Sequence, residues 1–155
     1  MKTRLIFFCC LLITTSLWAQ KIEEFPKGNL APNVHHTGKV WLNFLSQSND
    51  HFPYNMVLAT MAAGAKLDWH RHEQGQQLVV TAGMDFYQER GKEVQIIRQG
   101  DVIDTTPGVD HWNAATPSTS VAYLAIYPPY PTQWKEAVDQ VYYQTIEYPI
   151  ERKKP

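Results

Sequence analysis

Apolar and polar residues alternate over short stretches from Val40 onward, and glycine, proline or asparagine interrupts them at regular intervals. The apolar stretches are residues 40–44, 55–62, 67–72, 76–81, 84–89, 92–97, 101–105, 111–115 and 121–126. Short segments separated by turn residues are typical of a β-sandwich or β-barrel. No long stretch before Pro131 keeps a 3.6-residue apolar period, so we expect an all-β domain.

The pattern changes after the last predicted strand. Trp134, Val138 and Val141 fall at positions i, i+4 and i+7, which predicts a short amphipathic helix beginning near Pro131 and Thr132. We expect this helix to cover one end of the barrel or to contact a partner. The predicted organisation is an N-terminal arm at residues 20–36, a barrel at residues 37–130, and a C-terminal helix and tail at residues 131–155.

The first 19 residues have the organisation of a secretory signal peptide. A lysine and an arginine give a positive start, residues 5–12 form an unbroken apolar run, and Ala19 offers a small residue for cleavage. This run is much shorter than the roughly 20 residues that a membrane-spanning helix needs, although an uncleaved anchor is the alternative. We expect export to the periplasm or the medium, a mature N-terminus at Gln20, and no stable membrane anchor after cleavage.

Both cysteines of the chain, Cys9 and Cys10, lie in the predicted signal peptide. We therefore expect neither thiol chemistry nor a disulfide in the exported protein. The formal net charge of the whole chain is −1 and its lysines and arginines form no basic patch, which argues against a nucleic acid partner. The residues that remain suffice for one domain with its own core.

Candidate chemistry begins with His70 and His72, which lie two residues apart in one predicted strand. Successive strand side chains alternate between faces, so both imidazoles are expected on the same side. Such a pair alone is weak evidence for a metal. Gln76 follows after a Gly-containing bend, where a hairpin would bring it beside the pair, and His111 follows a Pro-Gly turn that aims it back into the barrel.

These residues resemble the two motifs of the cupin family. The matching text is Gly64-x5-His70-x-His72-x3-Gln76-x6-Gly83, with glutamine where glutamate is common, and Gly100-x5-Thr106-Pro107-Gly108-x2-His111. The resemblance covers about residues 37–143. It is closest to a group of small cupins that includes the bacterial manganese-dependent hydroxynitrile lyases.

The resemblance implies a double-stranded β-helix, a jelly-roll-like barrel, that often dimerises through edge strands. It also implies one divalent metal held by His70, His72, Gln76 and His111. Nitrogen and oxygen ligands of this kind suit Mn, Fe, Co, Ni or Zn, and the resemblance favours manganese. Because Gln76 is neutral where a carboxylate is usual, the ion should stay electrophilic and resist oxidation, which favours redox-neutral chemistry.

The resemblance further implies that Val57, Ala59 and Tyr127 line a substrate pocket, where Tyr127 either donates its hydroxyl or packs at the barrel mouth. Alternation places Asn113 on the same face as His111. The lyase group has a histidine at this position, proposed to handle the proton, and asparagine cannot act as a general base. Asn113 is expected either to donate a hydrogen bond to an oxygen at the metal or to be a buried polar residue satisfied by the backbone.

The remaining polar and aromatic residues near the motifs have simpler expected roles. Asp68 alternates in phase with His70 and is expected either to orient an imidazole or to be solvated at the strand end. Trp69 and Trp112 flank ligand histidines and are expected to pack on the opposite face. The histidines expected to be solvated in loops rather than to bind metal are His35, His36 and His51.

We therefore expect a metal-dependent enzyme that acts on a small oxygenated organic molecule by lyase, isomerase or hydrolytic chemistry. Two alternatives remain open: a non-catalytic cupin module that binds a small ligand, and a metal-dependent dioxygenase. Asn113 favours the binding module, because no general base is evident, whereas Gln76 counts against the dioxygenase.

Overall fold

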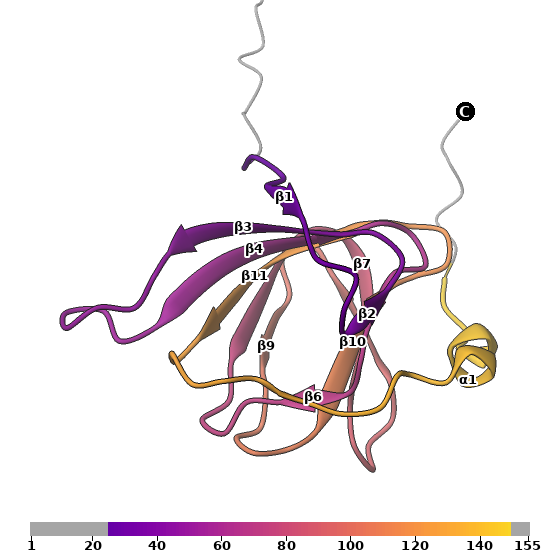
Figure 1. Ribbon diagram of the computed structural model, residues 1–155. Coiled ribbons are helices and arrows are strands. Elements are labelled where there is room, and N and C mark those ends of the chain that lie inside the picture. The colour runs from indigo at the N-terminus through magenta and orange to yellow at the C-terminus, as the bar shows by residue number, and fades with distance from the viewer. Residues whose placement is uncertain (1–24, 150–155) are drawn as a thin grey trace, which may run out of the picture.

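The computed structural model describes residues 25–149, and most of their regular structure is β-strand (Figure 1). The longer strands are β3 (Val40–Ser46), β4 (Asn55–Met61), β7 (Gln77–Glu89), β8 (Gln95–Arg98), β10 (His111–Ala115) and β11 (Val121–Tyr127). The shorter ones are β1 (Asn29–Leu30), β2 (His36–Thr37), β5 (Lys66–Leu67), β6 (His70–Arg71), β9 (Val102–Asp104) and β12 (Gln133–Trp134). The expected all-β fold is confirmed. The predicted signal peptide lies outside the described residues.

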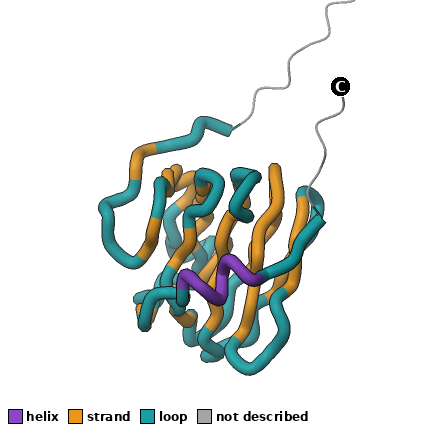
Figure 2. The backbone as a smooth tube through the Cα atoms, turned by 90° about the vertical axis from the view of Figure 1, so that its right-hand side faces the viewer, coloured by secondary structure: helices purple, strands orange, loops and turns teal. Residues whose placement is uncertain are grey.

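The strands form one antiparallel sheet that curls into a half-barrel (Figures 1 and 2). The order along it is β1-β3-β4-β11-β7-β10-β5-β2. Strand β7 is central, because its first half pairs with β9 and β11 while its second half pairs with β8 and β10. The two walls of the barrel therefore share a single continuous strand.

The sequence predicted two strands, 76–81 and 84–89, where the structure has the single strand β7. The error comes from reading Gly83 as a turn. Gly83 has φ +76, and the register against β11 shifts beside it, between Ala122 and Tyr123. A Cβ at this glycine would lie 1.9 Å from the carbonyl oxygen of Ser120. Glycine thus lets β7 bend from one wall to the other without breaking.

Two apolar clusters lie on opposite faces of the wall that β8, β10 and the second half of β7 form. The interior cluster includes Val40, Met61, Leu78 and Tyr87. The outer cluster contains Phe86, Trp112, Ala114, Val138 and Tyr143, beneath the C-terminal helix. Alternation along β10 explains why that whole strand is buried, because its odd-numbered residues face the interior and its even-numbered residues face the helix. The packing role expected of Trp69 and Trp112 is confirmed by their edge-on ring contact at 6.3 Å.

The C-terminal helix exists, but its predicted start was wrong. Helix α1 spans Gln140–Thr145, and Asp139 caps it by accepting a hydrogen bond from the Tyr142 amide at 2.7 Å. Residues near 133–134 instead form β12, which pairs with β6. Val141, expected on the apolar face, is 70% exposed. Figure 2 shows α1 lying across the outside of the strands.

The predicted strand at residues 67–72 is also divided, into β5 and β6, because the chain bends at Asp68 and Trp69. Parts of the N-terminal arm form strands: β1 pairs with β3, and β2 pairs with β5. No helix within residues 25–149 has the length and the apolar character required to cross a bilayer.

Candidate metal centre

Strands β6 and β10 bring the three predicted histidine ligands together inside the barrel. His70 on β6 lies directly opposite His111 on β10, with the ring centroids 4.4 Å apart. The His72 ring lies 5.5 Å from that of His70 and 5.8 Å from that of His111. One nitrogen from each of the three rings lies within 4.8 Å of the others, and all three residues are buried. This separation allows the nitrogens to converge on a single ion.

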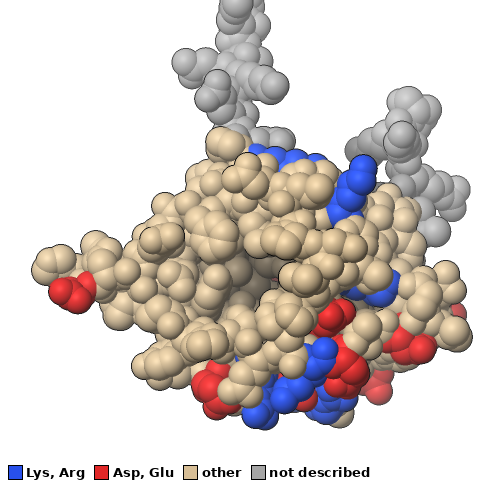
Figure 3. Space-filling model, in the orientation of Figure 1, with Lys and Arg blue, Asp and Glu red and all other residues tan. Residues whose placement is uncertain are grey.

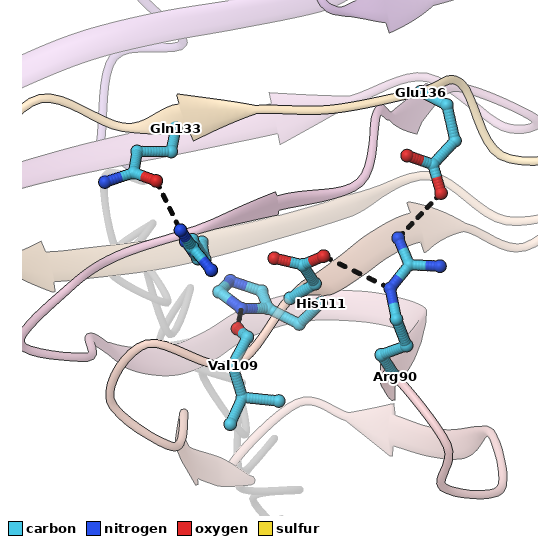
Figure 4. Close-up of polar contacts among 7 residues, drawn as sticks. Arg90, Val109, His111, Gln133 and Glu136 are labelled. Carbon is cyan, nitrogen blue, oxygen red and sulfur yellow. Dashed lines mark hydrogen bonds and ion pairs between the residues drawn. The ribbon is translucent and has the colours of Figure 1, made fainter.

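Backbone carbonyls set the direction in which two of the rings point. The Nδ1 atom of His70 lies 2.8 Å from the carbonyl oxygen of Asp68. The Nδ1 atom of His111 lies 3.1 Å from the carbonyl oxygen of Val109 (Figure 4). A carbonyl can only accept, so Nδ1 carries the proton and Nε2 is left with its lone pair facing the centre. Asp68 therefore orients His70 through its main chain, while its carboxylate lies 3.8 Å from His35.

Gln76 lies beside this cluster, immediately before β7 rather than within it. Its amide Nε2 is 2.9 Å from Nε2 of His111. Its backbone N–H donates to Thr105 Oγ1 at 2.8 Å, and its carbonyl accepts from the Thr105 N–H at 2.8 Å. Rotation of the side-chain amide about its own axis presents Oε1 to the same point without moving the backbone.

Two glycine turns join the two motifs at His72. The carbonyl oxygen of His72 accepts hydrogen bonds from the N–H groups of Gly75 and Gly108, both at 3.0 Å. Gly75 has φ +75, and a Cβ there would lie 2.7 Å from the carbonyl oxygen of Thr105. A side chain at this position would therefore push apart the loops that carry Gln76 and His111.

Burial keeps the histidines in the form that binds metal. Desolvation, together with His111 and His72, places the pKa of His70 well below its ordinary value. Desolvation and the neighbouring His111 lower the pKa of His72 to about 4. Burial also lowers the pKa of His111, against the opposing effects of the Val109 carbonyl and the carboxylates of Glu89 and Asp110. All three imidazoles are thus neutral at neutral pH, as ligation requires.

A cavity of about 280 Å³ opens above the histidines, and its lining is mostly apolar. The residues expected to form the substrate pocket, Val57, Ala59 and Tyr127, all lie in this lining, as does Asn113. The Tyr127 ring packs 5.2 Å from that of His72, at a tilt of 37°. Figure 3 shows a hollow on this face with a largely uncharged rim, while the charged side chains gather below it.

Several aromatic residues that were not expected at the cavity line it, including His35, His36, Tyr123 and Trp134. Trp134 of β12 and His35 of the N-terminal arm both line it, and their rings are stacked at 4.6 Å with an interplanar angle of 4°. His35 was expected to be solvated, and Trp134 was assigned to a helix. The positive φ of His35, +59, turns the arm over the cavity. Neither contact has a local sequence signal, because each depends on strand pairing between distant segments.

Two arginines hold the segment that carries Trp134. The Nε atom of Arg71 donates to Gln133 at 2.9 Å, and Arg90 donates to Glu136 at 2.6 Å (Figure 4). Arg90 also donates to Asp110, the residue before His111, at 3.2 Å. Its guanidinium lies 4.2 Å from the centre of the Trp69 ring. The Arg90 guanidinium therefore joins the Trp134 segment to the residues that precede His70 and His111.

Asp85, which the sequence pattern did not single out, has its side chain within the barrel. Its Oδ2 atom is 3.4 Å from Nδ2 of Asn113, and the residue is completely buried. A signal for it was present, because Asp85 alternates in phase with Tyr87 and Glu89 along a strand that has one buried face.

The donor set fits a divalent transition metal. Three neutral imidazoles and a carboxamide are ligands for Mn, Fe, Co, Ni or Zn, whereas calcium and magnesium prefer sites made of oxygen atoms. The donors carry no net charge, so an ion held by His70, His72, His111 and Gln76 retains its full positive charge.

Comparisons with known proteins agree with this architecture. The cupin domain family matches residues 57–127. The (R)-mandelonitrile lyase of Granulicella tundricola is 40% identical over 90 residues, which are 58% of this chain and 69% of the lyase.

Two solved structures extend the comparison. A cupin-like protein from Thermotoga maritima has a TM-score of 0.74 and 32% identity, covering 79% of this chain and 95% of that one. A cupin 2 conserved barrel domain protein from Rhodopseudomonas palustris has a TM-score of 0.61 at 14% identity, covering 68% and 74%, and is similar in fold alone. On its motifs, its fold and these relatives, the chain belongs to the cupin superfamily.

Proposed function

We propose that this cupin uses one divalent transition metal, most simply manganese, as a Lewis acid on a small oxygenated organic molecule, in lyase- or isomerase-type chemistry. The observation that carries the proposal is the convergence of three neutral histidine nitrogens within 4.8 Å beneath an apolar cavity. Similarity to a mandelonitrile lyase over 58% of the chain supports the lyase class.

The chain's own residues have separable tasks in this proposal. A divalent ion at the histidines supplies positive charge that polarises a carbonyl or hydroxyl oxygen. Val57, Ala59 and Tyr127 exclude water and hold the organic part of the substrate. Asn113, which lines the same cavity, orients an oxygen of the substrate by a hydrogen bond.

The test begins with the metal content of the purified protein and of three variants: His70→Ala, His72→Ala and His111→Ala. Each should nearly empty the site, while Gln76→Ala should weaken it less, because an imidazole nitrogen binds these ions more strongly than an amide oxygen. His51→Ala, a change in an exposed loop, is the matched control. Equal metal content in all of these forms would overturn the metal site.

Turnover is then measured on Mn(II)- and Fe(II)-loaded protein with a panel of cyanohydrins, hydroxy acids and carbonyl compounds, while oxygen consumption is followed. Product without oxygen uptake supports the proposal, whereas oxygen uptake that depends on substrate supports a dioxygenase. Ligand binding without any turnover supports the second candidate, a non-catalytic binding module. Asn113 is the observation that favours this candidate, since it lines the cavity where a general base would be needed.

Export and dimerisation are separate parts of the proposal. We infer from residues 1–19 that the protein is exported and that the mature chain begins at Gln20. Mass spectrometry of the mature protein tests this, and retention of residues 1–19 would contradict it. Among the strands within residues 25–149, β1 pairs only with β3, and this exposed edge supports a homodimer, because an unpaired strand edge needs covering. Light scattering that shows only monomer at high concentration would reject the dimer.

A further inference from the structure

The carboxyl group of Asp85 lies inside the barrel, on the side of Asn113 away from the cavity. Asn113 lines the cavity and Asp85 does not. Asp85 is 0% exposed, and its Oδ1 atom has no hydrogen-bond partner among the residues that the structure describes. Among the described side chains, its other oxygen, Oδ2, contacts only Asn113, whose Nδ2 atom lies 3.4 Å away. A buried carboxyl with so few partners is costly in its charged form.

Among the residues that the structure describes, none supplies Asp85 with a compensating cation. The ionisable groups that act on it are two phenols, Tyr123 from β11 and Tyr143 from α1, and burial raises the pKa of both. Ile97 lies opposite Asp85 on β8. The nearby Lys66 on β5 directs its ammonium elsewhere, to the Gln140 side chain at 2.6 Å.

Burial therefore decides the charge of this carboxyl. It raises the pKa of Asp85 to about 8, against the smaller opposing effects of hydrogen bonds from Asn113 and from the backbone N–H groups of Ala114 and Phe86. At neutral pH the carboxyl carries a proton, which it can donate. A neutral carboxyl can donate a hydrogen bond to the amide beside it, whereas a carboxylate can only accept one.

The amide of Asn113 has two ends of nearly equal size, an oxygen that accepts and a nitrogen that donates. A carboxylate at residue 85 accepts from the nitrogen, which leaves the amide oxygen for the cavity. A protonated carboxyl instead donates to the amide oxygen, which leaves the N–H bonds of Asn113 for the cavity. The two arrangements differ by a rotation of the amide group together with a turn of the Tyr123 hydroxyl, which also hydrogen-bonds Asn113.

We propose that Asp85 is a positioning residue that sets which end of the Asn113 amide faces the cavity, and that its protonated form makes this wall a hydrogen-bond donor for oxyanions. The inference rests on the proposed function for the identity of the site, and it adds the class of ligand: a molecule with a negatively charged or strongly accepting oxygen. Deprotonation of Asp85 converts the same wall into an acceptor that repels such an oxygen.

The first experiment observes the two side chains directly. The carboxyl carbon of Asp85 and the side-chain amide of Asn113 are followed by NMR through pH 8, in metal-free protein and in protein loaded with diamagnetic zinc. We expect both signals to move with one common midpoint, and the Asn113 signal to stop moving in Asp85→Asn. A carboxyl that titrates near its ordinary value of about 4, or an Asn113 amide that ignores it, overturns the inference. The wild-type titration stands even if the variant does not fold.

The second experiment measures the affinity of zinc-loaded protein for benzoate below and above pH 8. A hydrogen bond to a charged group supports a roughly tenfold loss in affinity above the midpoint for the wild type. The same loss is expected for Asp50→Asn, a matched change in an exposed loop, and none for Asp85→Asn. Equal pH dependence in the wild type and Asp85→Asn overturns the inference. Because no turnover is measured, absence of catalysis contradicts the proposed function and leaves this result intact.

Discussion

The indole of Trp134 lies 4.8 Å from the imidazole of His70, at a tilt of 40°, and its strand pairs with the strand that carries that histidine. The same indole also stacks on His35, with the ring centroids 4.6 Å apart and an interplanar angle of 4°. Segments from both ends of the described chain therefore close one side of the cavity above the metal ligands.

Trp134→Ala should weaken ligand binding without emptying the metal site. The indole is not a ligand, but its ring forms part of the cavity lining. Aromatic contacts of this kind contribute about 0.5–1.5 kcal/mol beyond the area they bury, so benzoate affinity should fall roughly threefold to tenfold. The measurement is titration at matched metal content. Tyr130→Ala is the control, since Tyr130 is an exposed aromatic residue of the same segment that does not line the cavity.

Metal binding should persist below the ordinary histidine pKa of roughly 6.5. The sequence alone predicts that binding fades there, as the ligands become protonated. Burial lowers the pKa of His72 to about 4 and that of His70 well below its usual value, so both stay neutral to lower pH. Retained metal should therefore persist below pH ~6.5 and be lost as the pH falls toward about 4. Dialysis followed by metal analysis checks this, and loss complete above pH 6 would contradict the burial argument.

Glu89→Gln should weaken the hydrogen bonds that hold the turn at Thr106, which precedes His111, and so destabilise the domain. Burial alone would raise the pKa of Glu89, but hydrogen bonds from Lys92, Thr106 and Tyr87 bring it down to about 2. Glu89 Oε1 accepts from the Thr106 amide at 2.8 Å and from the Tyr87 hydroxyl at 3.0 Å. Hydrogen bonds to a charged group contribute about 1.5–3 kcal/mol, so the free energy of unfolding should fall by an amount in that range.

The same carboxylate gives a pH dependence whose sign is fixed. Because its pKa is lower in the folded protein than in the unfolded chain, the stability it contributes is present above pH 4.5 and is lost as the pH falls toward about 2. Denaturant unfolding of wild type and Glu89→Gln should differ at neutral pH and converge in acid. Glu93→Gln, an exposed change on the adjacent loop, should behave as wild type at every pH.

The wild-type protein should be a poor hydroxynitrile lyase, and Asn113→His should improve it. Cleavage of a cyanohydrin requires a group that accepts the hydroxyl proton, and an asparagine cannot accept it. A histidine at residue 113 can, and the structure places the Asp85 carboxyl beside it. A positioned base contributes on the order of a hundredfold to ten-thousandfold, and we expect a gain at the low end of this range.

Mandelonitrile cleavage at fixed manganese occupancy measures the effect, because altered metal loading would resemble altered catalysis. Fast cleavage by the wild type would show that the proton leaves by another route and that Asn113 has been assigned the wrong role. Inactivity of both forms with a full metal site would favour the binding module.

The cluster of three histidines was predictable because it depends on spacing. Alternation, the Pro-Gly turn and the resemblance to the cupin motifs together placed His70, His72 and His111 on one interior face, and the bounds of β10 coincide with the predicted segment. Trp134 was not predictable, because two residues of strand become stable only by pairing with β6. Asp85 was overlooked because a charged residue in a strand is ordinarily exposed.

The shared strand β7 has a consequence for how the molecule comes apart. Because one chain segment supplies hydrogen bonds to both walls, neither wall can open without stripping the other of its partner. Amide protons on β10 and β11 should therefore exchange with solvent at similar, slow rates through a single global event. A substitution at Gly83, far from the histidines, should lower the melting temperature of the whole domain and release the metal at the same temperature.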